Sequence, residues 1–298
     1  MEKVGIIGLG RVGMPSARRF IKAGYHVVGF DRRQELIEEL KSTGAETARD
    51  CKEVAQESET IIVLVLNDQQ VIDVVTGPNG TLAGSNSKSK LICMSTINRD
   101  NLELVAKKCR ENHVGFVDCP FTGGPARAEN GTLTLIAAAP RRLLETCRPI
   151  LEVLGEIVYA GETPGMGQSV KHCNQLLVGT THAAVMETIA MARKIGLDPR
   201  LVCKVIGEGI AGSDYFRLLS SSVLDNTPSP GGLGQMCKDM DIVVNTARLL
   251  KLPLFVATSA YHYFLAARAL GMEDQEGSQL IRVVERISEP DGSNSGVS

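Results

Sequence analysis

The chain has 298 residues, of which 43% are hydrophobic and 22% are charged, and its formal net charge is −2. These values are typical of a globular protein that is long enough for two domains with separate cores. Because the chain is nearly neutral and has no dense basic cluster, we expect no nucleic-acid partner.

The eight cysteines are scattered along the chain, and none forms a Cys-x-x-Cys pair. This spacing predicts no metal site and favours reduced, mostly buried thiols over disulfides. The most apolar long stretch, residues 170–192, carries charged and amide side chains that oppose burial in a bilayer. Since no signal-peptide pattern is present either, we expect no membrane partner and a location in the cytoplasm or inside an organelle.

The first half of the chain alternates short β-branched runs with segments of helical apolar spacing. We expect strands at residues 4–7, 26–30, 60–66, 91–94, 115–118 and 132–137. Strands that alternate with helices predict a parallel sheet with helices on both faces.

After Tyr159 the pattern changes to a turn-rich break and then to helical runs without a convincing strand. We expect helices at residues 168–194, 199–208, 234–250, 253–270 and 275–287. The sequence therefore predicts an α/β, Rossmann-like domain over residues 1–162. An all-α domain over residues 163–290 follows, beginning with a long interdomain helix, and residues 291–298 have the composition of a loose tail.

A glycine motif joins the first expected strand to the first expected helix. Gly8 would permit a tight turn, Gly10 the close approach of a pyrophosphate, and Gly13 the close packing of helix on strand. The helix N-terminus would then offer free amides and a partial positive charge to the phosphates. We therefore expect a bound nicotinamide dinucleotide.

Asp31 ends the second expected strand, about 20 residues after the glycine motif, where a carboxylate can hydrogen-bond the ribose of NAD. A carboxylate there also repels a 2′-phosphate, so we expect NAD in preference to NADP. Arg32 and Arg33 follow directly and could weaken this preference, although we interpret them as a solvated helix start.

Paired glycines follow Thr122 in the segment after the fifth expected strand. The amides of Gly123 and Gly124 could converge into a small nest for an anion, with the Thr122 hydroxyl as a further donor. This arrangement suits a substrate carboxylate, but an ordinary Gly-Gly turn explains the pattern equally well. Arg127 could add a second anion contact, although we favour a solvated side chain.

Lys171 lies early in the long apolar helix that follows the break. A lysine partly desolvated there can have its pKa lowered toward the range of an acid–base catalyst. Asn174 and Gln175 follow at i+3 and i+4, so their side chains can flank the ammonium. The alternative is a lysine that extends its charge to solvent.

Two histidines in the same helix are alternatives to Lys171 as a base. His182 would lie roughly 16 Å further along the axis, too far to share a reacting atom with Lys171 in this helix. His172 points away from the Lys171 face. We interpret both as structural residues.

Together these segments resemble the β-hydroxyacid dehydrogenase family, which includes 3-hydroxyisobutyrate dehydrogenase, tartronate semialdehyde reductase and sulfolactaldehyde reductase. The resemblance covers nearly the whole chain, and its motifs occur in order. They are the Gly8–Gly13 signature, the segment 94–97 that would lie under the nicotinamide, the loop 118–124 with 131–133, Gly165-Met-Gly167 with Lys171, and Lys238-Asp239.

The resemblance implies that Lys171 is the general acid/base and that Asn174 and Gln175 assist it in catalysis. It implies substrate contacts at Thr122, Gly123, Gly124, Lys171, Asn174 and Gln175. It implies cofactor contacts at Gly8, Leu9, Gly10, Arg11, Val12, Gly13, Asp31, Val65, Leu66, Thr96 and Lys238. The fold would be 6-phosphogluconate dehydrogenase-like, with a helical domain that serves substrate binding and assembly into a homodimer or homotetramer.

This chain departs from the family at two positions. It has Thr122 where the family usually has Ser, and Gln175 where the family usually has Asn. Both changes keep the polar group but reshape the pocket. They argue against naming a substrate by analogy.

We therefore expect an NAD-dependent dehydrogenase or reductase that interconverts a small anionic β-hydroxy acid and its semialdehyde or keto form. An imine reductase-like enzyme and a non-catalytic dehydrogenase-like binding module are the alternatives. Both types tend to lack the catalytic lysine, so Lys171 argues against them.

Overall fold

The computed structural model describes residues 3–229 and 231–288, and the predicted loose tail at 291–298 lies outside this range. The chain divides into two compact units, Met1–His172 and Cys173–Ser298, which are described separately.

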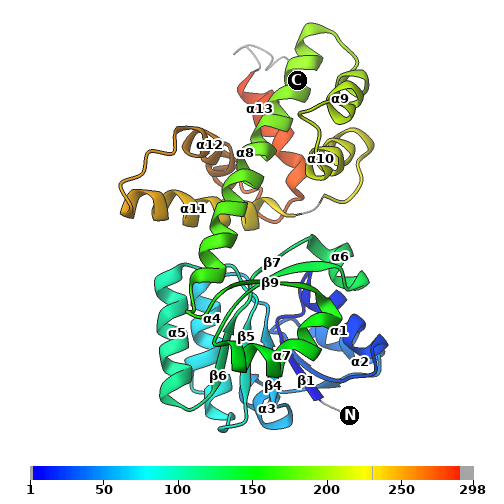
Figure 1. The fold of residues 1–298 in the computed structure, drawn as a ribbon. Helices are drawn as coiled ribbons and strands as arrows, with labels where there is room; N and C mark the ends of the chain where they lie inside the picture. Colours follow the sequence, from blue (N-terminus) through cyan, green and yellow to red (C-terminus); the bar gives the residue numbers. More distant parts are fainter. Residues whose placement is uncertain (1–2, 230, 289–298) are drawn as a thin grey trace, which may run out of the picture. The chain divides into compact units, whose positions relative to one another are not determined.

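The first unit is a sheet with helices on both faces, as the sequence predicts (Figure 1). Its strands are β1 Lys3–Ile7, β2 His26–Phe30, β3 Glu46–Thr47, β4 Thr60–Val63, β5 Lys90–Cys93, β6 Gly115–Asp118, β7 Phe121–Thr122, β8 Leu133–Ala138 and β9 Gly155–Gly161. Its helices are α1 Gly13–Lys22, α2 Gln34–Ser42, α3 Cys51–Glu57, α4 Asp68–Thr76, the short 3₁₀ helix η1 Thr81–Ala83, α5 Arg99–Glu111, α6 Gly124–Asn130 and α7 Arg141–Leu154.

The strand order is β3-β2-β1-β4-β5-β6-β8-β7, with β9 paired to β8. The strands from β3 through β6 pair in parallel, and β8 pairs antiparallel with β6 and β7. The carboxyl ends of the parallel strands share one edge of the sheet, where ligands bind in folds of this kind. The predicted cofactor residues after β1, β2, β4 and β5 are therefore at the same edge.

Alternation along the strands places apolar side chains on both faces of this sheet. In β4, Ile62 belongs to the core under α1, α2 and α7, whereas Val63 belongs to the core under α4 and α5. Both side chains are fully buried, as expected for parallel strands covered on both faces. Figure 1 shows α4 and α5 along one side of the sheet and α1, α2 and α7 along the other.

The strands β3, β7 and β9 and the end of β4 differ from the sequence prediction. The pattern predicts no strand at 155–161, but β9 forms there and pairs in parallel with β8. The expected strand at 60–66 ends at Val63, and the next residues form the loop before α4. Asn67 caps α4, because its side-chain oxygen accepts from the Gln70 amide at 2.9 Å.

The second unit consists of helices in its described residues. Helix α8 Met166–Ile195 enters it from the first unit and is followed by α9 Pro199–Glu208, α10 Asp214–Asp225, α11 Leu233–Leu249, α12 Phe255–Ala269, the 3₁₀ helix η2 Gly277–Gln279 and α13 Leu280–Ile287. The sequence analysis missed α10, which Ser213 caps at the Phe216 amide. Buried residues of α8 and α11 to α13, among them Met186, Met240 and Phe264, share one core.

Candidate active site

The loop between β1 and α1 has the backbone geometry that the glycine motif predicts. Gly8 has a φ of 93°, in the region that favours glycine. A Cβ on Gly13 would lie 1.9 Å from the Gly8 carbonyl oxygen, so only glycine permits this packing. Within 4 Å, a Cβ on Gly10 would meet only an Arg33 guanidinium nitrogen, at 3.5 Å. The loop therefore leaves space beside Gly10 and fits a dinucleotide pyrophosphate.

Asp31 follows β2 and is held by donors on both carboxylate oxygens. Oδ2 accepts from the Leu9 amide at 2.8 Å, and Oδ1 accepts from the amide and Nε of Arg33, both at 3.0 Å. Arg33 Nη2 adds a bond to Oδ2 at 3.0 Å. Arg33 thus has a specific partner and is not simply the solvated residue that the sequence analysis expects.

These contacts also determine the ionisation of Asp31. Burial raises the pKa of its carboxyl, but the Arg33 guanidinium and the amides of Arg33 and Leu9 outweigh that effect, so the pKa lies below its ordinary value. A negative charge is therefore maintained at the position where a cofactor ribose would lie.

The structure brings Lys171 close to the predicted substrate loop within the first unit. Lys171 is 8% exposed, and its Nζ lies 6.0 Å from the centre of the Phe121 ring. Phe121 and Thr122 form β7, which the pairing with Leu135 and Thr134 of β8 holds in place. The Lys171 side chain therefore lies near the strand that carries the Thr122 hydroxyl.

The two glycines after Thr122 have the backbone freedom that the predicted anion nest requires. Gly123 has a φ of 131° and Gly124 a φ of 72°, both in the region that favours glycine. Arg127 is exposed on α6, in agreement with the solvated side chain that the sequence favours.

A buried polar network connects the start of α8 to the sheet. Asp118, at the end of β6, accepts from the amides of Gly165 and Gln168 through Oδ2, at 2.8 and 3.2 Å. Its Oδ1 accepts from the Gln168 side chain at 3.1 Å. Burial raises the pKa of Asp118 to about 6, although these hydrogen bonds oppose the change.

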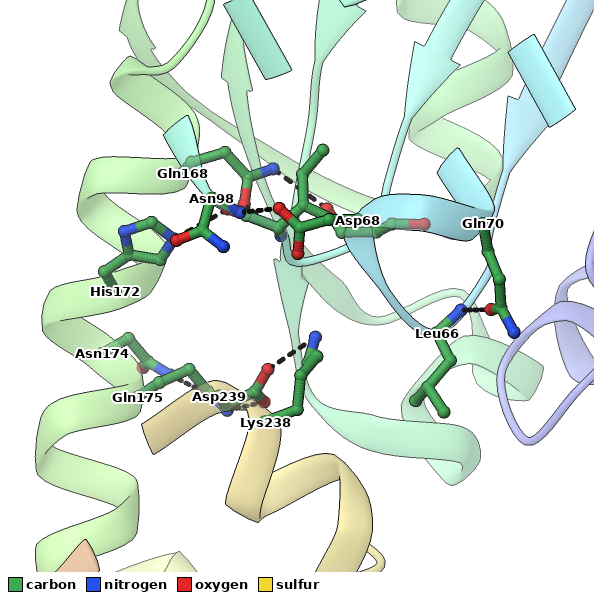
Figure 2. A network of polar contacts seen from close by, with 12 residues as sticks. Leu66, Asp68, Gln70, Asn98, Gln168, His172, Asn174, Gln175, Lys238 and Asp239 are labelled. Carbon is green, nitrogen blue, oxygen red and sulfur yellow. Dashed lines mark hydrogen bonds and ion pairs between the residues drawn. The ribbon is translucent and has the colours of Figure 1, made fainter. Parts of the chain in front are cut away.

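The predicted cofactor residues Val65, Leu66 and Thr96 lie in the loops that follow β4 and β5. Leu66 is 54% exposed, and its amide donates to Gln70 Oε1 at 2.9 Å (Figure 2). Thr96 is half-buried. Because β1, β4 and β5 are adjacent and parallel, these loops and the glycine loop share one edge of the sheet.

In the second unit, a further buried network connects α8 with α11. Gln175 Nε2 donates to Asp239 Oδ2 at 2.5 Å, and Asn174 Nδ2 donates to Gln175 Oε1 at 2.9 Å. Lys238 Nζ lies 2.8 Å from Asp239 Oδ1 (Figure 2). The Gln175 amide that the sequence analysis assigns to catalysis thus has its orientation fixed by a carboxylate.

Both histidines of α8 make structural contacts. His172 is buried, with Nε2 3.0 Å from the Ile97 carbonyl oxygen. His182 Nε2 lies 2.9 Å from the Gly277 carbonyl oxygen, and its Nδ1 lies 3.0 Å from the Tyr215 hydroxyl. Burial lowers the pKa of His182 to about 4, so its ring is neutral near pH 7.

Three residues of these networks, Asp118, Gln168 and Asp239, had no role assigned from the sequence, although Asp118 and Asp239 lie in motifs of the resemblance. Asp118 has a detectable signal, because a carboxylate at the end of a parallel strand lies at the ligand-binding edge. Gln168 lies three residues before Lys171, on the same helix face. Neither signal reveals the partners, which come from segments distant in sequence.

Seven of the eight cysteines are buried, and Cys173 is exposed. Among the described residues, no three histidine, cysteine or carboxylate side chains are grouped closely enough to hold a metal ion. None of the described helices has both the length and the apolar character needed to span a membrane.

Two protein-family comparisons match the chain in succession. Residues 3–161 match the NAD binding domain of 6-phosphogluconate dehydrogenase, and residues 165–284 match the NAD-binding domain of NADP-dependent 3-hydroxyisobutyrate dehydrogenase. The first match covers more than half of the chain. A dinucleotide-binding domain is thus present where the glycine motif predicts it.

Individual relatives match over nearly the full length. L-threonate dehydrogenase of Haemophilus influenzae is 30% identical over 96% of this chain and 96% of its own. The structure of 3-hydroxyisobutyrate dehydrogenase from Salmonella typhimurium is 28% identical, has a TM-score of 0.88 and covers 95% of this chain and all of its own. The structure of Psf3 in complex with NADP+ and 2-OPP is 26% identical, with a TM-score of 0.87 over 94% of this chain and 99% of its own.

Imine reductases are more distant. The enzyme from Pseudomonas is 19% identical, with a TM-score of 0.63, a likeness of fold alone. One family accounts for the fold, for the glycine loop at the edge of the sheet and for the full-length matches. This chain belongs to the β-hydroxyacid dehydrogenase family of NAD(P)-binding oxidoreductases.

Proposed function

We propose that this chain is an NAD-dependent dehydrogenase or reductase that interconverts a small β-hydroxy acid and its semialdehyde or keto form. The observation that carries the proposal is the position of Lys171, buried at the start of α8 with its Nζ 6.0 Å from the ring beside Thr122. A buried amine next to a loop built to hold an anion is suited to proton transfer on a bound hydroxy acid.

Nicotinamide, when bound, supplies the hydride chemistry at the carbinol carbon. Lys171 Nζ accepts the hydroxyl proton as the alcohol is oxidised and returns a proton to the carbonyl oxygen in the reverse reaction. The Thr122 hydroxyl and the amides of Gly123 and Gly124 hold the substrate carboxylate and so orient the carbinol carbon. The methyl of Thr122 narrows this subsite compared with serine.

The Asp31 carboxylate supports a preference for NAD over NADP, because a negative charge there opposes a 2′-phosphate. Its ion pair with Arg33 moderates that preference, since the guanidinium can turn from Asp31 toward a phosphate. We therefore propose NAD as the preferred cofactor and NADP as a weaker one.

The remaining site assignments stay predictions from the resemblance. They are Leu9, Arg11, Val12, Val65, Leu66, Thr96 and Lys238 for the cofactor, and Asn174 and Gln175 for catalysis and substrate. The small anionic substrates named for the relatives, L-threonate and 3-hydroxyisobutyrate, define the class in which this chain's own substrate is to be sought.

We further propose assembly into a homodimer or homotetramer through the helical domain, a domain division near residues 162 and 163, and a cytoplasmic location. Apolar side chains on and beside α9 support the assembly. Leu201, Val205 and Ile210 are 59%, 63% and 107% exposed, which is costly in water unless a surface covers them.

The test is a panel of small hydroxy acids and semialdehydes, followed by NADH fluorescence, with wild type and Lys171→Ala. Turnover on at least one carboxylate substrate is expected, and Lys171→Ala should lower it by ~10²–10⁴-fold. NADH affinity should stay nearly unchanged, and Lys107→Ala on α5, where the side chain is exposed, provides the matched lysine control. Unchanged turnover in Lys171→Ala would refute the mechanism, and reduction of imines instead of carbonyls would favour the imine reductase alternative.

A further inference from the structure

The Gln168 side chain uses its full hydrogen-bonding capacity inside the first unit. It is 0% exposed. Its Oε1 accepts from the Ile97 amide at 3.1 Å, and its Nε2 donates to the Ser95 carbonyl oxygen at 3.0 Å and to Asp118 Oδ1 at 3.1 Å. One amide thus joins the start of α8 to the segments that follow β5 and β6.

These partners are themselves fixed to the sheet. The Met94 amide donates to the Val63 carbonyl oxygen at 2.9 Å, which extends the β4–β5 pairing into this segment. Asp118 is the last residue of β6 and lies in register with Cys93 of β5. The sheet is therefore held by its own strand pairing, and Gln168 fixes the position of the start of α8 relative to it.

The contact surface leaves no room for adjustment at the first turn of α8. A Cβ on Gly167 would lie 2.7 Å from the Ile136 carbonyl oxygen and 2.9 Å from Asp118 Oδ2. The helix backbone consequently rests directly on β8 and on the Asp118 carboxylate. Loss of a hydrogen bond of the Gln168 side chain would therefore shift the backbone of α8, because no flexible side chain lies between the helix and the sheet at Gly167.

Lys171 lies three residues after Gln168 on the same helix, about 4.5 Å along the axis and on nearly the same face. Thr96 lies between Ser95 and Ile97, the two residues whose backbone Gln168 holds. The same amide therefore sets the spacing between the Lys171 ammonium and the Thr96 segment.

We propose that Gln168 is a positioning residue that holds Lys171 in register with the segment around Thr96. The inference rests on the proposed acid–base role of Lys171. Because the Gln168 side chain is fully buried and its amide is bonded within the protein, we expect its removal to act through the placement of Lys171.

The test is a double-mutant cycle between Gln168→Met and Lys171→Ala. Methionine has a similar length but neither donates nor accepts strongly. In the wild-type background, Gln168→Met should lower kcat by roughly 10–100-fold, the scale expected for a displacement of about 1 Å. In the Lys171→Ala background, the same substitution should lower the residual kcat by less than about threefold, because the group that it positions is gone.

Binding of NADH, followed by its fluorescence, supplies a readout apart from turnover. The Kd for NADH should change by less than about threefold, because the glycine loop and Asp31 remain intact. Val54→Ala on α3 is the matched control: it opens a buried site in the same unit, so it lowers stability but should leave kcat unchanged. If Gln168→Met does not fold, Gln168→Asn, which keeps the amide but is one methylene shorter, replaces it in the cycle.

An equal loss of kcat in both backgrounds would assign Gln168 a merely structural role and overturn the inference. So would an unchanged kcat or a large rise in the Kd for NADH. Each of these outcomes leaves the proposed function standing as long as Lys171→Ala alone lowers turnover by the expected ~10²–10⁴-fold. If Lys171→Ala has no effect, the proposed function fails whatever Gln168 does.

Discussion

Two carboxylates end strands at the same edge of the sheet and yet differ in their chemistry. Asp31 follows β2 and shares its charge with the Arg33 guanidinium, which keeps its pKa below the ordinary value. Asp118 ends β6 and is surrounded by neutral amides of Gly165 and Gln168, and burial raises its pKa to about 6. The position in the fold is similar, but the partner decides the ionisation.

The two carboxylates also suit different tasks, recognition of a ligand at Asp31 and a fixed helix position at Asp118. Asp31 is the proposed ribose ligand, and its partner Arg33 is more than half exposed. Asp118 is fully buried, and its donors are the Gly165 amide and the backbone and side-chain amides of Gln168 at the start of α8. A charged, exposed pair suits recognition, whereas a buried amide network suits a fixed position.

The largest expected difference is in stability. Asp118→Ala would leave the Gly165 and Gln168 donors buried without an acceptor, at about 1–3 kcal/mol for each unsatisfied group. We expect a loss of about 3 kcal/mol or more in the free energy of unfolding, measured by urea denaturation. Asp31→Ala removes a partly exposed ion pair and should cost about 1 kcal/mol or less. Equal losses in the two variants would contradict the comparison.

The pH dependence of stability should have opposite signs at the two sites. Because the folded protein raises the pKa of Asp118 from 3.8 to about 6, it binds this proton more tightly than the unfolded chain. The stabilisation of the folded protein by the Asp118 proton is fully present below pH 3.8. It is lost as pH rises through 6, and the total loss in the free energy of unfolding is about 3 kcal/mol. The lowered pKa of Asp31 contributes in the opposite sense, and its stabilisation is lost as pH falls.

The measurement is the free energy of unfolding of wild type and Asp118→Asn across pH 4 to 7. Asparagine does not titrate, so the difference between the two proteins isolates the Asp118 proton. The stability of wild type relative to this variant should decrease with rising pH. A relative stability that increases with pH would show that the hydrogen bonds outweigh burial.

The smallest effect concerns cofactor choice. Arg33→Ala frees the Asp31 oxygens for ribose hydroxyls and removes a cation that could pair with a 2′-phosphate. We expect the Kd for NADPH to rise about 10-fold, equivalent to about 1.4 kcal/mol, and the Kd for NADH to change by less than threefold. Fluorescence titration with each cofactor measures both values.

Arg148→Ala is the matched control for that experiment, because it removes the same charge from an exposed ion pair with Glu145 on α7. It should leave both affinities unchanged. If Arg33→Ala weakens NADH as much as NADPH, Arg33 serves to hold Asp31 in place and not to discriminate between the cofactors.

The errors of the sequence analysis have local physical causes. Strand β9 escapes notice because Gly155–Gly161 follows α7 without a turn of its own, and its stability comes from pairing with β8. Helix α10 escapes because its apolar residues, such as Phe216 and Leu219, are interrupted by serines. The interpretation of Arg33 as solvated is wrong because the order of residues does not show that its guanidinium turns back to the Asp31 carboxylate.

The sequence by itself determined the parts in which function depends on backbone conformation or on a residue type at a fixed spacing. Gly8, Gly10 and Gly13 predict a dinucleotide loop because their spacing suits a tight turn, room for a pyrophosphate and close packing of helix on strand, and apolar periodicity predicts the parallel sheet and the long α8. The tertiary structure alone decided how Lys171 is held. Asp118, Ser95 and Ile97 are distant from Gln168 in the chain, and only the parallel pairing of β5 with β6 brings them within hydrogen-bond reach of α8.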